Sequence, residues 1–301
     1  MKLDTHVHSV FSGHSSIKPL DRLMRESYNT PAFIYDQATS RGMDLVTITD
    51  HDRIDGVLTI AHRPNVIIGC EVTATFPRDG VRVHLGVLGI TEAQFREIDR
   101  RRTDITALMP YLKREGIFVS LNHVASRVNG RITAAHIAAL IPWIHALEVI
   151  NGSRLERQNL TAWRIATANG KVGIAGSDAH TGRGVGLTWA EAPHARTRAE
   201  FMTELRAGRV RVGGRHGNAL TMASDVMRMT ASLYDEHGRA LLERPWRWRR
   251  QLMMACLAIG APLVAVPLVA STLHFVLEAR FNRALLQDVT QRADLRMPKV
   301  A

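Results

Sequence analysis

The residues best suited to chemistry in this sequence are histidines and carboxylates that stand on or just after short apolar segments. Two pairs, His6-x-His8 and Asp178-x-His180, have the two-residue spacing that puts both side chains on the same side of a strand. Neutral imidazole and carboxylate are the ligands that zinc, manganese and iron prefer. The residues of this kind are His6, His8, His51, Glu71, His84, His123, Asp178 and His180.

A single histidine on an apolar strand is more often a core residue than a ligand, but several at strand ends are typical of a metal centre. A carboxylate such as Glu71 can bridge two ions. Two metal ions held about 3.5–4 Å apart polarise a phosphoryl oxygen, generate hydroxide at neutral pH and stabilise the leaving oxygen. The pattern therefore indicates a hydrolase with a centre of two or three divalent metal ions, which we expect to be zinc, manganese or iron.

Alternating strands and helices must bring these residues together. Apolar runs without strict polar alternation are typical of strands buried on both faces. We predict strands over residues 2–6, 45–49, 66–73, 81–88, 117–121, 146–150 and 172–175. Helical patterns cover residues 31–41, 92–115, 134–140, 154–169 and 198–206. Seven such units favour an α/β fold, a (β/α)7 barrel in which the carboxyl ends of the strands meet on one face; an open doubly wound sheet is the alternative.

The motifs resemble those of the PHP family, named for polymerase and histidinol phosphatase domains. The matching motifs are Asp4-Thr5-His6-Val7-His8, Thr49-Asp50-His51-Asp52, Asn122-His123 and Ser177-Asp178-Ala179-His180, with Glu71 and His84 between them. The resemblance covers residues 1–215. It implies a distorted seven-stranded barrel, up to three metal ions at nine ligands, and hydrolysis of phosphomonoesters or phosphodiesters. The ninth ligand is His14, in a loop where many members have an aspartate.

The resemblance also implies a small phosphorylated substrate, so cationic groups should face the site. Arg127 follows His123 and Arg183 follows His180, and we expect both to bind phosphate. Asp50 and Asp4 are expected to orient His51 and His6 through ring N–H bonds.

The last part of the chain differs from the rest. After a basic linker, residues 216–250, comes a run without charge, residues 251–277, and then a polar tail, residues 278–301. A membrane helix needs about 20 apolar residues. We therefore expect a transmembrane helix over 251–277 that contacts membrane lipid, with the catalytic domain in the cytoplasm. The alternatives are a buried helix of an oligomer and a soluble cytoplasmic protein.

The net charge of +11 gives little support to nucleic-acid binding, beyond a nucleotide or oligonucleotide as substrate. Residues 239–301 carry 10 Lys and Arg against 4 Asp and Glu, so more than half of the excess lies outside the main domain. The sequence thus predicts a metal-dependent phosphoesterase in which a metal-bound hydroxide attacks phosphorus. An amidohydrolase-like enzyme and a membrane-anchored, non-catalytic PHP module are the alternatives. The two cysteines, Cys70 and Cys256, are too few for a disulfide framework.

Overall fold

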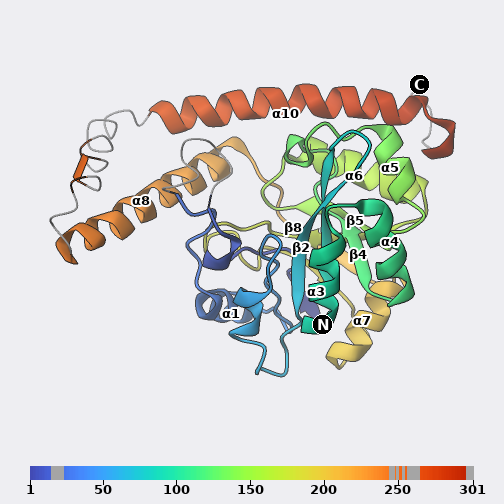
Figure 1. The fold of residues 1–301 in the computed structure, drawn as a ribbon, viewed down its shortest axis with the longest axis horizontal. Helices are drawn as coiled ribbons and strands as arrows, with labels where there is room; N and C mark the ends of the chain where they lie inside the picture. Colours follow the sequence, from blue (N-terminus) through green and yellow to red (C-terminus); the bar gives the residue numbers. More distant parts are fainter. Residues whose placement is uncertain (15–23, 244–247, 249–250, 253–254, 256–264, 296–301) are drawn as a thin grey trace.

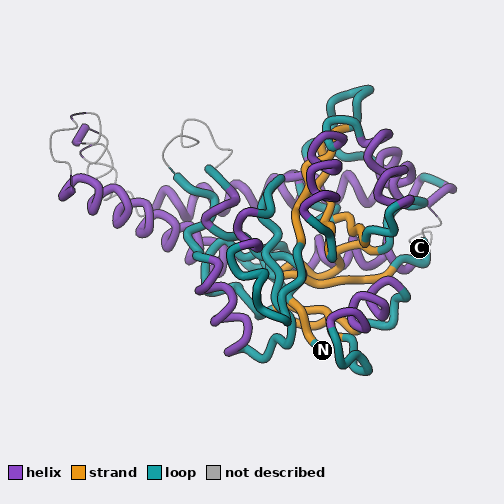
Figure 2. The backbone as a smooth tube through the Cα atoms, turned by 60° about the horizontal axis from the view of Figure 1, so that its bottom comes forward, coloured by secondary structure: helices purple, strands orange, loops and turns teal. Residues whose placement is uncertain are grey.

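Two β-sheets form the centre of the molecule, with helices packed around them (Figures 1 and 2). The computed structural model describes residues 1–14, 24–243, 248, 251–252, 255 and 265–295. The larger sheet has the strand order β2-β3-β4-β5-β6 and the smaller the order β1-β7-β8. The strands are β1 (Lys2–Leu3), β2 (Gly69–Thr75), β3 (Arg82–Leu88), β4 (Phe118–Leu121), β5 (Ala146–Asn151), β6 (Val172–Gly176), β7 (Thr188–Glu191) and β8 (Arg211–Gly214).

The predicted seven-stranded parallel barrel is wrong, because the strands divide between two mixed or antiparallel sheets. β2 pairs antiparallel with β3, and β3 antiparallel with β4; only β4, β5 and β6 run parallel. The reason lies in the connection over residues 76–81, which is far shorter than the crossover of about a dozen residues that a parallel pair requires. The segment predicted as a strand at 45–49 makes isolated bridges instead, parallel to residues 3 and 66.

The helices mostly lie where the sequence pattern predicts them. Thr30 and Thr91 begin two of them by accepting a bond from a backbone N–H, and the predicted helix over 92–115 breaks in two at Asp104, which caps the second half. The helices are α1 (Pro31–Ser40), α2 (Asp55–Leu58), α3 (Glu92–Arg101), α4 (Ile105–Arg114), α5 (Ala134–Leu140), α6 (Glu156–Ala168), α7 (Arg198–Arg206), α8 (Ala219–Glu243) and α10 (Ala265–Gln291), with short 3₁₀ turns η1 (Val10–Ser12), η3 (Arg127–Asn129) and η4 (Ala293–Leu295).

The core gives the site a rigid support. Side chains of β2 to β5 such as Val72, Leu85, Leu121 and Leu147 are completely buried. Burial of this kind stabilises by about 1.5–3 kcal/mol for each large aliphatic side chain. The polar residues of the predicted site sit at one edge of this apolar layer, so their positions are fixed by strands that cannot easily shift.

The predicted transmembrane helix over 251–277 is wrong. Of that range, residues 253–254 and 256–264 lie outside the described residues. Among the helices that the structure describes, none combines the length and the apolar composition that a membrane span requires. Residues 265–277 form the first part of α10, which continues to Gln291 through charged residues that include Glu278 and Arg280. The uncharged run of residues 251–277 did not indicate that the helix formed by its last part continues and packs against the rest of the protein.

The second half of α10 docks on the domain and crosses α6 and α5 (Figure 1). Leu285, Val289 and Leu295 are buried in this contact. The Glu278 side chain is also buried, and it accepts bonds from the backbone N–H of Arg127, at 3.2 Å, and from Gln158 Nε2, at 2.6 Å. Asp288 accepts from the backbone N–H of Ala134, at the start of α5. Helix α10 is thus hydrogen-bonded to the loop that follows His123.

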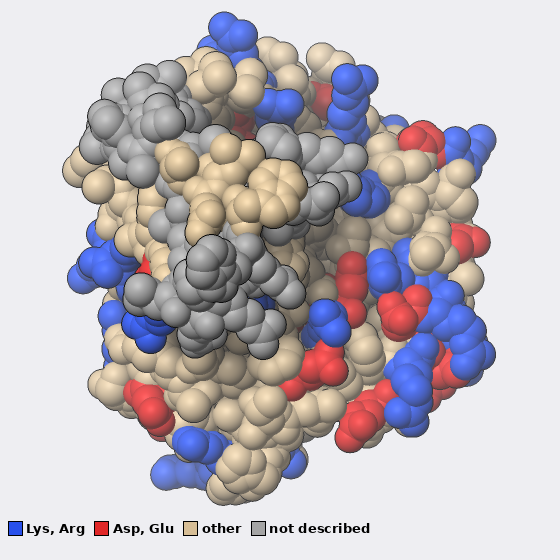
Figure 3. All heavy atoms as spheres, turned by 60° about the vertical axis from the view of Figure 1, so that its left-hand side comes forward, with Lys and Arg blue, Asp and Glu red and all other residues tan. Residues whose placement is uncertain are grey.

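Charges of both signs are mixed on the described part of the face shown in Figure 3. Lys and Arg side chains there alternate with Asp and Glu rather than forming one continuous basic stripe. A stripe of that kind is the usual electrostatic footprint of a nucleic-acid-binding surface. This face therefore adds nothing to the weak nucleic-acid signal of the net charge.

Candidate metal centre

Six segments far apart in the sequence converge on one cluster of imidazoles and carboxylates. Its centre is Glu71 on β2, whose side chain is fully buried. Glu71 Oε1 lies 3.2 Å from His6 Nε2 and 3.0 Å from His123 Nε2, and Glu71 Oε2 lies 3.1 Å from His51 Nδ1. His84 Nδ1 on β3 is 3.6 Å from Oε1. Eight of the nine predicted ligands belong to this cluster: His6, His8, His51, Glu71, His84, His123, Asp178 and His180.

One side of the cluster, which we call the buried side, consists of His6, Glu71, His123 and Asp178. Each of these residues is at most 4% exposed. A second layer of polar residues fixes them. Glu148 Oε1 lies 2.9 Å from His6 Nδ1, and Arg154 Nη2 donates to Asp178 Oδ2 at 3.1 Å. Asn122 Nδ2 donates to Glu71 Oε1 at 2.9 Å. Partners of this kind set the ring orientation and the tautomer of a ligating histidine.

The other side, which we call the open side, consists of Glu26, His51 and His180. Their side chains are 25%, 18% and 24% exposed. Glu26 Oε1 lies 3.4 Å from His51 Nε2 and 3.8 Å from His180 Nε2. His8 joins the two sides, because its ring stacks on those of His51 and His180 while its Nε2 lies 2.9 Å from His6 Nε2. Among the described residues of the cluster, the more exposed side chains are thus those of the open side.

Glu26, which the sequence did not single out, lies beside His51 and His180, whereas His14 does not join the cluster in the described part of the chain. His14 is exposed and forms an isolated backbone bridge with Arg25. The groups of side chains that could hold a metal ion within the described residues do not include it. The sequence gave no warning of Glu26, since it stands in a segment with neither strand nor helix pattern. Its position beside two histidines makes it the carboxylate of the open side.

The two aspartates expected to orient imidazoles support the backbone instead. Asp50 accepts bonds from Ser9 N, at 2.6 Å, and from the hydroxyl of Ser12, at 2.8 Å. The Ser12 hydroxyl in turn lies 2.9 Å from His8 Nδ1, so Asp50 acts on His8 through Ser12. Asp4 accepts from the backbone N–H groups of Ser177 and Gly186, both at 2.8 Å. Burial raises the pKa of Asp4 to about 6.

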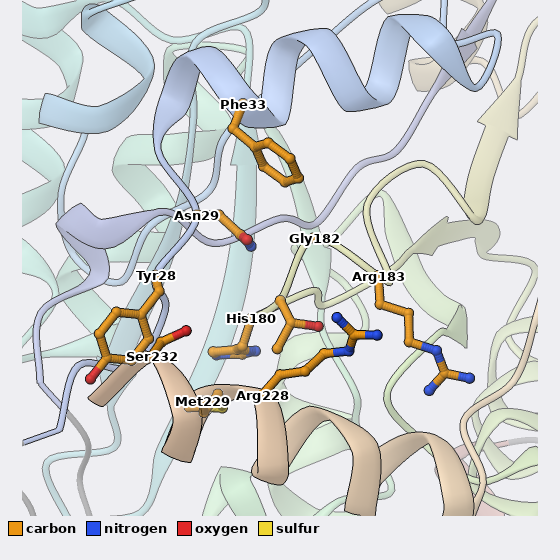
Figure 4. A pocket seen from close by; sticks show the side chains of 10 residues that line it. Tyr28, Asn29, Phe33, His180, Gly182, Arg183, Arg228, Met229 and Ser232 are labelled. Carbon is orange, nitrogen blue, oxygen red and sulfur yellow. The ribbon is translucent and has the colours of Figure 1, made fainter. Parts of the chain in front are cut away.

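The two predicted phosphate-binding arginines lie in different surroundings. Arg183 lines a cavity of about 340 Å³ that begins at His180 (Figure 4). Its Nη1 donates to the backbone carbonyl of Thr221 at 3.4 Å. Arg127 is exposed on η3, and its backbone N–H is bound to Glu278. It does not line the cavity beside His180.

The backbone of the cluster is locally strained. Asp52, His123 and Asp178 have positive φ angles of 52°, 27° and 50°. This left-handed region is unfavourable for residues with a Cβ, and it persists only where the surroundings enforce it. His123 N–H donates to Glu148 Oε2 at 2.9 Å and Asp178 N–H to the carbonyl of His6 at 2.8 Å, which holds both residues in place. Such strain is found most often at functional sites.

The donor atoms fit divalent metal ions. Glu71 Oε2, His84 Nδ1 and His123 Nδ1 are buried without a hydrogen-bond partner, which is costly unless another partner completes them. Three overlapping groups have all ligand atoms within 4.8 Å of one another: His8, His51 and His180; His6, His8 and Glu71; and His51, Glu71 and His84. These His and Glu clusters can hold divalent ions, and the site has the ligand chemistry of zinc, manganese or iron.

The pKa values show how strongly the cluster is charged without metal. Burial and the neighbouring His180 and His51 lower the pKa of His8 to about 3. Burial also disfavours the charged form of His51, but Glu71 and Glu26 outweigh it and raise the pKa to about 9. Burial opposes the ionisation of Glu71, yet His6, His84 and His51 hold its pKa well below the usual value. Protonated histidines here neutralise the carboxylates, a role that metal ions can take over.

Comparison with known proteins bears on the same region. Residues 156–210 match the PHP_C model, which is described as PHP-associated. A two-domain protein from Bacteroides vulgatus containing a predicted PHP-like metal-dependent phosphoesterase has a similar structure, with a TM-score of 0.55 and 17% identity over 75% of this chain and 69% of that chain. PsfC from Pseudomonas syringae gives a TM-score of 0.52 and 17% identity over 78% of this chain and 98% of that one. The sequence has no match among the curated proteins.

The match to residues 156–210 includes α6, β6 and the loop with Asp178 and His180, and it agrees with the motifs quoted from the sequence. At 17% identity the similar structures speak for the fold. Residues 156–210 are thus similar to a PHP-associated segment, and the fold of the chain is similar to those of the two structures.

Proposed function

We propose that this protein is a metal-dependent phosphoesterase that acts on a small phosphorylated substrate. The observation that carries the proposal is the convergence of three overlapping ligand groups on Glu71, next to a cavity with an arginine in its wall. The overlap supports two or three ions rather than one. The PHP-like phosphoesterase named in the similar structure agrees with this assignment.

The ligands we propose are His6, His8, His51, Glu71, His84, His123, Asp178 and His180, with Glu26 on the open side in place of His14. Divalent ions, when bound, act as Lewis acids that lower the pKa of water and stabilise negative charge on a phosphoryl group. Among the described residues, Glu71 is the carboxylate in contact with five histidines, so it could bridge neighbouring ions. Glu148 and the pair of Ser12 and Asp50 fix the ring orientations of His6 and His8.

The remaining residues deal with the substrate. Arg183 stands on the wall of the cavity that opens at His180, where a guanidinium can bind an anionic group of the substrate with two parallel bonds. The second proposed phosphate ligand, Arg127, would have to act from η3, outside this cavity. Burial of the cluster on all but the open side keeps bulk water from the reacting group, which strengthens every charge interaction within it.

The test is hydrolysis of chromogenic esters by protein that has been stripped of metal and reloaded with Mn²⁺ or Zn²⁺. We expect p-nitrophenyl phosphate or bis(p-nitrophenyl) phosphate to be hydrolysed, and chelation to abolish the reaction. His8→Ala should reduce the rate at least about 100-fold, because even the loss of an outer-layer partner costs 10–100-fold. His62→Ala, an exposed histidine outside the cluster, is the matched control. Fully metallated protein without activity on either ester would refute the proposal.

A further inference from the structure

The cavity beside His180 has walls from two different parts of the chain. One wall consists of Asn29, Phe33, His180 and Arg183 from the domain that carries the metal centre. The opposite wall belongs to α8 and contributes Arg228, Met229 and Ser232 (Figure 4). Phe33 packs directly on Gly182, where a Cβ would lie only 2.4 Å from the ring. Phe33 and Gly182 therefore form the apolar end of the cavity, and α8 bounds the other end.

Helix α8 contacts the two segments of the open side that contain Glu26 and His180. Asp225 Oδ1 accepts a bond of 2.7 Å from the hydroxyl of Thr181, the residue after His180. Glu236 Oε1 lies 2.9 Å from Arg25 Nη2, in the residue before Glu26. Leu233, between these two anchors, is buried. Positions 225, 228, 229, 232 and 236 are three or four residues apart, so they share one face of the helix, and that face looks at the metal centre.

Two arginines on the cavity wall are without a carboxylate partner. Arg228 extends from α8 towards the region between His180 and Arg183 in Figure 4. In the part of the chain that the structure describes, neither Arg228 nor Arg183 forms an ion pair. Asp225, the nearest acidic residue on the same helix face, is bound to Thr181 instead. Two guanidinium groups facing one cavity create a positive potential that favours the binding of an anion.

Metal ions, when bound, would contact the phosphate to be hydrolysed, and the cavity extends from His180 towards α8. We infer that Arg228 and Arg183 form an anion subsite beside the metal centre, which binds a second negatively charged group of the substrate, either a carboxylate or another phosphate. The inference rests on the proposed phosphoesterase function and deepens it by naming the substrate class. The cavity volume of about 340 Å³ limits that substrate to a small molecule. Phe33 and Met229 supply the apolar contact for its body.

The test compares aryl phosphates that differ in one group. 4-Carboxyphenyl phosphate carries the second anion, 4-carbamoylphenyl phosphate is its neutral counterpart, and 1,4-phenylene bisphosphate carries a second phosphate. The metal-loaded full-length protein should favour the anionic probes by at least about 10-fold in kcat/KM, as expected for a charge-assisted contact. Arg228→Ala should remove that preference, mainly through KM, while leaving the neutral probe within about two-fold. The ratio between the two anionic probes tells whether a carboxylate or a phosphate is preferred.

Arg239→Ala is the matched control, since Arg239 lies on the same helix but is exposed and paired with Asp235. Arg228→Lys should recover part of the preference, because it keeps the charge but loses the planar fork. An unchanged preference in Arg228→Ala would overturn the subsite, and so would equal loss on all three probes, which would assign the arginines to the phosphate being hydrolysed. Wild-type protein that hydrolyses none of the probes, nor the nitrophenyl esters, would instead count against the phosphoesterase function itself.

Discussion

The buried side and the open side of the metal centre use the same residue types in opposite ways. On the buried side, charged side chains stand behind two of the proposed ligands, Glu148 behind His6 and Arg154 behind Asp178. On the open side, Glu26, His51 and His180 are partly exposed, and the segments with Glu26 and His180 are held by α8. The buried side thus derives its order from the sheets, and the open side derives it from a helix beyond them.

This difference suggests that the buried side and the open side have different functions. The buried side would hold the ions in place, whereas the partly exposed side would meet the substrate and could vary with it. Changes on the buried side should therefore damage metal binding itself. Changes on the open side should have smaller effects that depend on the substrate.

The largest effect is expected from Glu71→Gln on the buried side. The substitution keeps the shape but removes the negative charge that five histidines surround. We expect metal content to fall below one ion per chain and kcat/KM to fall at least about 100-fold. Metal analysis and ester hydrolysis on the same preparation measure both. Full metal content together with normal turnover would contradict the central place of Glu71.

A smaller loss is expected from Glu26→Gln on the open side. We predict a decrease of about 10-fold in kcat/KM, since the residue lies beside two ligands but is a quarter exposed. His14→Ala is the matched comparison and should stay within two-fold of wild type, because His14 is exposed and outside the ligand groups. Metal titration followed by calorimetry would show the same order. A greater loss in His14→Ala than in Glu26→Gln would restore the ligand set expected from the sequence.

The smallest effect concerns the pH dependence of the metal-free protein. The folded-state pKa of His51 is raised from 6.5 to about 9. Its contribution to stability is fully present below pH 6.5 and is lost as the pH rises through about 9. We expect the Tm to fall by a few degrees between those values. His51→Gln should flatten this part of the curve, and His62→Gln should not; equal slopes in all three proteins would exclude His51 as the cause.

The sequence pattern singled out the proposed ligands that lie on or just after predicted strands better than those that do not. His6, His8, Asp178 and His180 were recognisable because strand periodicity and strand ends mark them. No strand or helix pattern in the sequence points to Glu26. It becomes a site residue only because its segment folds against His51 and His180. Glu148 could have been found, because a carboxylate within the otherwise apolar strand β5 is unusual and calls for a buried partner.

The fold was predictable in its elements but not in their pairing. Helices such as α5 and α7 lie where their patterns placed them, because local propensity and capping determine their ends. Pairing between strands depends on connection length, and the short link over residues 76–81 should have excluded a parallel arrangement. Strands β7 and β8 were missed, since each is only four residues long and neither is a continuous apolar run.

The buried Glu278 has a consequence for how the protein is cut for study. Removing everything after residue 240 to avoid the apolar stretch would leave the N–H of Arg127 and the amide of Gln158 without their acceptor. It would also uncover the apolar surface that Leu285, Val289 and Leu295 now cover. A protein shortened in this way could then lose activity because it lacks α10, although Glu278 lies more than 150 positions from His123 in the sequence.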